Sequence, residues 1–90
     1  MAIEFDPAKD AANVAKHGVS LARTGELLIW AFTENSRPEE SERRFRLYGL
    51  LDGEAVCAVV SWREETVRAI SLRKANRKER KIHGIGAEDR

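Results

Sequence analysis

The residues best suited to chemistry gather in one basic stretch, residues 67–81. Seven of its fifteen residues are lysine or arginine and one is glutamate, which gives a local charge of +6 in a chain whose formal charge is +1. The other 75 residues therefore sum to about −5. Clustered cations attract phosphate groups without special geometry. The stretch is either a solvated tail or a surface that meets a negatively charged partner.

Two arginines in this stretch are placed for a more specific role. Arg68 and Arg73 lie on a predicted strand and at its exit, where a rigid scaffold can aim planar guanidinium donors at a phosphate. Alternatively, they are ordinary surface cations or pair with Glu64 and Glu65. The remaining cations form a solvated helix face or a general phosphate-attracting surface: Lys74, Arg77, Lys78, Arg80 and Lys81.

Glu79 lies among these cations and has two interpretations. It is a candidate general base whose pKa the surrounding cations would lower. The spacing Asn76-x-x-Glu79 is also that of a capping box, in which each side chain binds a free backbone N–H at a helix start. We favour the cap, because it explains the glutamate without catalysis.

Metal, disulfide and membrane chemistry have little support in the sequence. The two histidines stand 66 positions apart and the carboxylates have no ligand spacing, so we expect neither a metal site nor a cofactor. The single cysteine, Cys57, excludes an internal disulfide and lies in the apolar run AVCAVV, which predicts a buried, inert thiol. The longest apolar runs have six residues and the N-terminus lacks a signal-peptide layout, so we expect a cytoplasmic protein.

A single α+β domain, residues 1–90, is predicted to position these groups. Residues 3–5 suit a short strand. Asp6 and Pro7 are typical of a helix start and Gly18 of its end. Alanines at positions 8, 11, 12 and 15 recur at helical spacing and predict a small buried side that packs close to a sheet. Ser20 then caps a second predicted helix, which ends near Phe32.

After an expected exposed loop at residues 33–42, the hydrophobic period changes to two. Phe45 and Leu47 alternate with three residues predicted to form a wet face: Arg44, Arg46 and Tyr48. Asp52-Gly53 predicts a hairpin turn, residues 55–62 a central strand covered on both faces, and residues 66–73 a third strand of an antiparallel meander. A short basic helix is predicted at residues 77–83, followed by a frayed tail at 84–90.

Several short sequence motifs occur along these predicted elements. FDPAK at residues 5–9 is followed by N-x-x-KHGVS at 13–20, E-R-R-F at 42–45, R-x-I-S-x-R-K-A at 68–75, and a basic helix that contains Glu79. In this order and spacing, over roughly residues 5–83, the chain resembles the BrnT toxin family. The resemblance implies a small RelE-like toxin of a bacterial type II toxin-antitoxin pair, acting as a ribonuclease that blocks translation. It also implies a BrnA-like ribbon-helix-helix antitoxin, and operator DNA bound only through the antitoxin complex.

RNA cleavage without a metal requires a base for the 2′-oxygen, cations at the phosphorus oxygens and an acid for the leaving 5′-oxygen. Arg68 and Arg73 are the candidate cations and Glu79 a candidate base. His83 stands where the family commonly has a tyrosine and is a candidate acid; its alternative is a frayed surface histidine.

Three groups on the first predicted helix are also candidates, because Lys9, Lys16 and His17 share one face. They can border the RNA groove, with His17 exchanging a proton near neutral pH. Alternatively, Lys16 and His17 are favoured simply by the helix dipole.

Two departures from the family pattern motivate a competing hypothesis. These are His83 and the end of the second predicted helix, LLIWAFTE. The competing hypothesis is a noncatalytic interaction protein, either an inactivated toxin that serves as an antitoxin-binding corepressor or a direct nucleic-acid binder.

Overall fold

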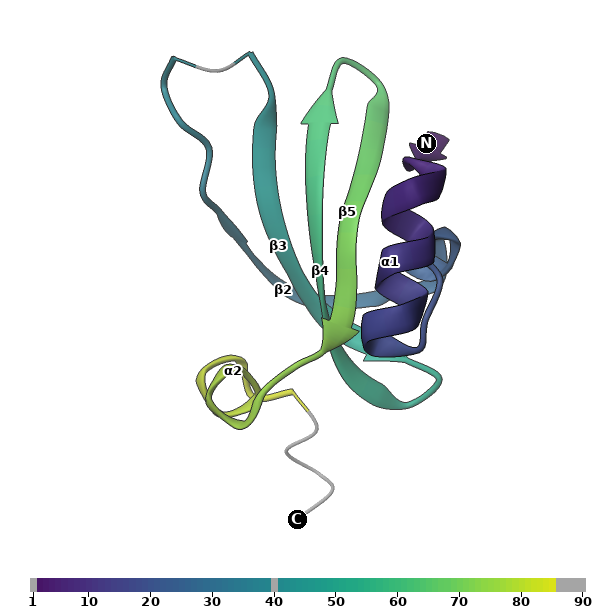
Figure 1. Ribbon diagram of the computed structural model, residues 1–90. Helices are drawn as coiled ribbons and strands as arrows, with labels where there is room; N and C mark the ends of the chain where they lie inside the picture. The colour runs from purple at the N-terminus through teal and green to yellow at the C-terminus, as the bar shows by residue number, and fades with distance from the viewer. Residues whose placement is uncertain (1, 40, 86–90) are drawn as a thin grey trace.

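A computed structural model describes residues 2–39 and 41–85 of the chain. It is an α+β fold in which one five-stranded sheet carries a helix at each side (Figure 1). The elements in chain order are β1 (Ala2–Glu4), α1 (Pro7–His17), the 3-10 helix η1 (Leu21–Glu26), β2 (Leu28–Glu34), β3 (Arg43–Leu51), β4 (Glu54–Arg63), β5 (Thr66–Lys74) and α2 (Arg77–His83).

The sheet is mixed, with strand order β1-β5-β4-β3-β2. β1 runs parallel to β5, and the other neighbours are antiparallel. The strand predicted to be central, β4, lies in the middle of the sheet, and the predicted hairpin turn at Asp52-Gly53 has positive φ at both residues. The antiparallel meander has one strand more than the three that were predicted, because β2 also pairs with β3.

The second predicted helix is wrong. Ser20 does accept a hydrogen bond from the backbone N–H of Ala22, but only the 3-10 helix η1 follows, and β2 begins at Leu28. The apolar run from Leu27 to Phe32 has no helical period, and Gly25 weakens a helix before it. The expected loop therefore begins after Glu34 instead of at residue 33.

β2 reaches β3 through a close backbone approach. A Cβ atom at position 49 would collide with the carbonyl oxygen of Leu28, so the glycine found there lets the two strands pair. The register then shifts between Ile29 and Ala31, which leaves Trp30 as the extra residue of a bulge.

α1 has its predicted ends but not its predicted buried side. Asp6 accepts from the N–H of Ala8 at 2.8 Å, and Gly18 takes a left-handed φ of 74°. The four alanines are exposed, and the buried residue of the helix is Asn13. Its amide donates to the carbonyls of Val19 and Leu72 at 2.8 and 2.9 Å and accepts from the N–H of Leu72 at 3.2 Å. A polar clamp to β5, rather than an alanine face, attaches this helix.

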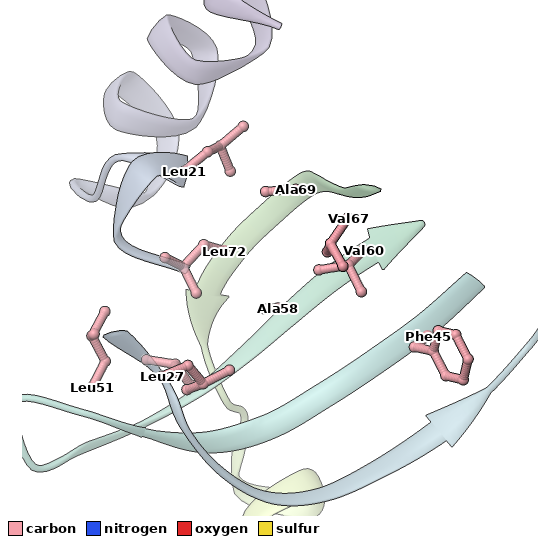
Figure 2. Packing of buried hydrophobic residues seen from close by; sticks show 10 residues of the cluster. Leu21, Leu27, Phe45, Leu51, Ala58, Val60, Val67, Ala69 and Leu72 are labelled. Atoms are coloured by element: carbon pink, nitrogen blue, oxygen red, sulfur yellow. The ribbon is translucent and has the colours of Figure 1, made fainter. Parts of the chain in front are cut away.

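The main core lies between the sheet and the layer formed by α1 and η1, on what we call the α1 face (Figure 2). Ala69 and Leu72 both belong to this core although they are three residues apart. The β4–β5 register jumps so that Ile70 has no partner, and this bulge restores the inward direction of Leu72.

A second cluster occupies the opposite side, which we call the α2 face. It contains Tyr48, Cys57 and Ile85. Tyr48 is 4% exposed, so its predicted place on a wet face is wrong, because the end of α2 covers it. Ile85 is 2% exposed, so the frayed tail predicted from residue 84 does not include it. The rest of that segment, 86–90, lies outside the described residues.

Candidate functional site

An arginine–glutamate pair joins the end of β5 to α2 on the α2 face. Arg73 Nη1 and Nη2 donate to Glu79 Oε1 and Oε2 at 2.8 and 2.9 Å. The pair is largely sheltered, since the side chains are 28% and 12% exposed. Nη1 also donates to the carbonyl of Lys74 at 3.2 Å. Paired parallel hydrogen bonds of this kind fix the guanidinium plane.

Glu79 also closes the predicted capping box. Its Oε1 accepts from the backbone N–H of Asn76 at 2.9 Å, and its own N–H donates to Asn76 Oδ1 at 2.8 Å. The hydrogen bonds from Arg73, helped by that backbone N–H, lower the pKa of Glu79 to about 2. The same contact raises the pKa of Arg73. A carboxylate held ionised this firmly is a weak proton acceptor, which favours the capping interpretation of Glu79 over the general base.

His83, at the other end of α2, stacks on Tyr48 of β3. The ring centroids are 4.0 Å apart and the planes differ by 24°. The alternative of a frayed surface histidine is therefore wrong. Cys57, the register partner of both Tyr48 and Arg73, is fully buried, and burial raises the pKa of its thiol, as expected of an inert cysteine.

His17 comes close to the same end of β5. It lines a depression of about 190 Å³ together with Arg73 and Lys74. Lys74 lies 3.4 Å from Glu54 in an exposed ion pair. His17 and Lys16 also lie in the last turn of α1, where the dipole favours cations, so both interpretations of these residues fit their placement.

Arg68 does not join this group. Arg73 pairs in register with Cys57 and Arg68 with Ser61, so four residues of β4, about 13 Å at the usual strand rise, separate them. Arg68 donates to Glu4 Oε1 at 3.1 and 3.2 Å, and both side chains are more than half exposed. The predicted partners Glu64 and Glu65 are therefore wrong; Glu4 and Glu79 take their place.

The remaining predicted cations are exposed and lie in two places. Lys9 and Lys16 are on α1. Four cations lie on α2, the helix that ends at His83: Arg77, Lys78, Arg80 and Lys81. In residues 2–39 and 41–85, no three histidine, cysteine or acidic side chains gather as a metal ion would require, and no helix there has the length and apolar character needed to span a membrane.

Sequence reasoning missed two contributors to this site. Tyr48 supplies the platform for His83, and Arg46, exposed on β3, adds positive charge near Glu79. The alternating pattern of the strand placed Tyr48 and Arg46 on one face. Only the register of β3 with β4 shows that this face lies against α2.

A family model described as "Ribonuclease toxin, BrnT, of type II toxin-antitoxin system" matches residues 5–79. The chain belongs to this family. The match includes Arg68, Arg73 and Glu79 and ends before His83.

A solved BrnT has a similar fold. The 1.1 Å crystal structure of the Brucella abortus ribonuclease toxin, BrnT, superposes with a TM-score of 0.66 over 86% of this chain and 99% of that one, at 24% sequence identity. A search of the curated proteins finds no match. Membership of the BrnT family makes this chain a toxin of a type II toxin-antitoxin system, with RNA and an antitoxin as the general kinds of partner.

Proposed function

We propose that this chain, a RelE-like member of its family, is a metal-independent endoribonuclease that cuts RNA beside Arg73 and His83 and so blocks translation. One observation carries the proposal: the basic helix α2 fixes the Arg73 guanidinium through Glu79 and ends in the His83 imidazole, which is stacked on Tyr48. The site combines a rigid cation with a group that can transfer a proton.

The proposed reaction is attack of the RNA 2′-oxygen on the adjacent phosphorus. The phosphorus–5′-oxygen bond breaks, leaving a 2′,3′-cyclic phosphate and a 5′-hydroxyl. Arg73 stabilises charge on the phosphorus oxygens and His83 gives a proton to the leaving 5′-oxygen. His17 lines the same depression as Arg73 and takes the proton of the 2′-hydroxyl in this scheme. Glu79 holds Arg73 in place.

The exposed cations bind the RNA backbone in this proposal. Arg77, Lys78 and Lys81 of α2, with Lys74, extend the positive field from the cleavage point, and Arg68 holds a more distant phosphate on the same sheet face. Lys9 and Lys16 reach the RNA only where it passes along α1.

The proposed partner is a BrnA-like ribbon-helix-helix antitoxin that silences the toxin in the cytoplasm, and operator DNA is bound only through the complex. Its gene is expected beside that of the toxin. DNA-binding assays should then show operator binding by the complex and none by this chain alone. Operator binding by the isolated chain would contradict this arrangement.

RNA cleavage is tested with purified chain and RNA in excess EDTA. Cleavage should persist and leave cyclic-phosphate and 5′-hydroxyl ends. Arg73→Ala and His83→Ala should each lower it more than tenfold, whereas Arg37→Ala, a matched loss of one exposed cation in the loop between β2 and β3, should change it less than threefold. Intact RNA in the presence of folded wild-type chain would overturn the proposal.

A second candidate function has one specific observation in its favour. Three of the five N–H donors of Arg73 are already engaged by Glu79 and the Lys74 carbonyl. If RNA does not displace them, the chain is an inactive toxin homologue that acts as an antitoxin-binding corepressor. Intact RNA together with operator binding that requires both proteins would select this function.

A further inference from the structure

The helical layer leaves part of the α1 face uncovered. α1 and η1 make their main sheet contacts with β5, at one side of the sheet, and Figure 1 shows α1 standing along that strand. Toward the opposite edge lies an apolar cleft of about 560 Å³. Side chains from β2, β3 and β4 line much of it, among them Ile29, Phe32, Phe45, Leu47, Val60 and Trp62.

This cleft continues onto an unusually apolar edge strand. Ile29, Trp30 and Phe32 of β2 are 51–61% exposed, and Trp62 is 38% exposed. Together they expose on the order of 500 Å² of apolar surface, near the upper range for a monomer and a mark of an interaction site. No described strand pairs with the outer edge of β2, and residues 28–33 contain neither a charge nor a proline to protect it.

The charges at the cleft argue for a protein occupant. Arg43 is the charged residue of its lining, and Glu34 accepts from Nε and Nη2 of that arginine at 2.9 and 2.8 Å. The Arg43 guanidinium also lies 5.1 Å from the centre of the Phe45 ring. Because Glu34 neutralises Arg43, the cleft is close to neutral, whereas the cations of α2, which suit nucleic acid or anionic lipid, lie on the opposite face.

The width of the uncovered surface fits one helix. Three strands at 4.7–4.9 Å spacing span roughly 10 Å, and an α-helix with its side chains is about 10–12 Å wide. A helix on β2, β3 and β4 would lie beside the existing layer and complete a two-layer α/β arrangement. Phe32, Phe45 and Trp62 pack ring against ring, with centroids 6.1 and 6.2 Å apart, and form a preformed aromatic floor for it.

We propose that an amphipathic helix of the antitoxin docks in this cleft and buries apolar residues spaced i, i+3 or i+4 and i+7 against Phe32, Phe45 and Trp62. The inference rests on the proposed function, since it requires an antitoxin. It assigns the antitoxin to the α1 face, away from the cations of α2.

The test measures the affinity of the full chain for the product of the neighbouring antitoxin gene, by calorimetry. Ile29→Glu and Phe32→Glu place a charge in the cleft and should each weaken binding at least 50-fold. The matched control is Leu28→Glu, on the same strand and 71% exposed. Leu28 pairs with Leu50, which packs against the cluster of the α2 face, so this control should change affinity less than threefold. Circular dichroism and thermal melting establish that all three variants fold.

Each other outcome overturns the inference. Unchanged binding by the folded cleft variants, or an equal loss in Leu28→Glu, would place the antitoxin elsewhere. A 50-fold loss on replacing Arg77, Lys78 and Lys81 with alanine would place it on α2. A wild-type dimer in sedimentation that Phe32→Glu dissociates would assign the cleft to a second copy. If the wild-type chain binds no antitoxin at all, the proposed pairing itself fails, which is distinct from selective failure of the cleft variants.

Discussion

The two ends of β5 carry the same kind of ion pair in different surroundings. Arg68 meets one oxygen of Glu4, and both side chains are more than half exposed. Arg73 meets both oxygens of Glu79 and is sheltered by α2. An exposed pair contributes little and exchanges its partner easily, whereas a sheltered bidentate pair fixes geometry and costs much to break. In the proposed function, the Arg68 end attracts RNA and the Arg73 end positions the chemistry.

The largest expected effect comes from removing the sheltered arginine. Arg73→Ala leaves Glu79 ionised and largely buried without its partner, and should lower the free energy of unfolding by about 3 kcal/mol. Urea denaturation measures this, and hydrogen exchange should show faster opening of α2. A decrease in the free energy of unfolding below about 0.5 kcal/mol would mean that the sheltered pair of Arg73 contributes no more stability than the exposed pair of Arg68.

Low pH should selectively weaken the ion pair between Arg73 and Glu79. The folded-state pKa of Glu79, about 2, lies below its ordinary value of 4.5, so the pair contributes its full stability above pH 4.5 and loses it as pH falls toward 2. Over that range the wild type should lose on the order of 2 kcal/mol more than Glu79→Gln. Stability curves that run parallel for the two proteins would show that Glu79 is not held ionised by folding.

Substitutions of His83 distinguish its packing on Tyr48 from its proposed role in proton transfer. His83→Phe keeps an aromatic ring on Tyr48 and should change stability by less than about 1 kcal/mol. The phenyl ring transfers no proton, so the RNA cleavage rate should fall 10–100-fold. Cleavage at the wild-type rate would remove His83 from the chemistry, and His83→Gln serves as a polar control without a titratable group.

The smallest effect is expected at the exposed pair. Arg68→Ala should change the free energy of unfolding by less than about 0.5 kcal/mol, because water and salt replace the contact with Glu4. RNA affinity should fall three- to tenfold at low salt, with a shallower salt dependence, which filter binding over a salt series measures. Glu4→Gln is the matched control, since it removes the same ion pair but keeps the cation.

Local signals in the sequence predicted much of the fold. Asp6-Pro7 and Gly18 bound α1, Asp52-Gly53 forms a turn, and Asn76 with Glu79 caps α2. Each depends on backbone groups a few residues away, so spacing was sufficient. The predicted BrnT resemblance is confirmed by the family match.

Contacts between distant segments decide the parts that spacing missed. The buried side of α1 is set by Asn13 and Leu72, which are 59 positions apart. The segment of β2 was predicted as a helix because a short apolar run without a period does not distinguish a helix from a strand. Its pairing with β3 depends on a close approach that Gly49 permits. In the candidate site, Arg73 and Glu79 are near in sequence, while Tyr48 comes to His83 only through the sheet.

The central claim is that cleavage occurs at the Arg73 end of β5. It is tested most directly by single-turnover cleavage rates at saturating RNA in EDTA, where differences in affinity no longer matter. The expected result is a rate at least 100-fold lower for Arg73→Ala and within threefold of wild type for Arg68→Ala. Equal rates in the two variants, or a larger loss in Arg68→Ala, would contradict the account.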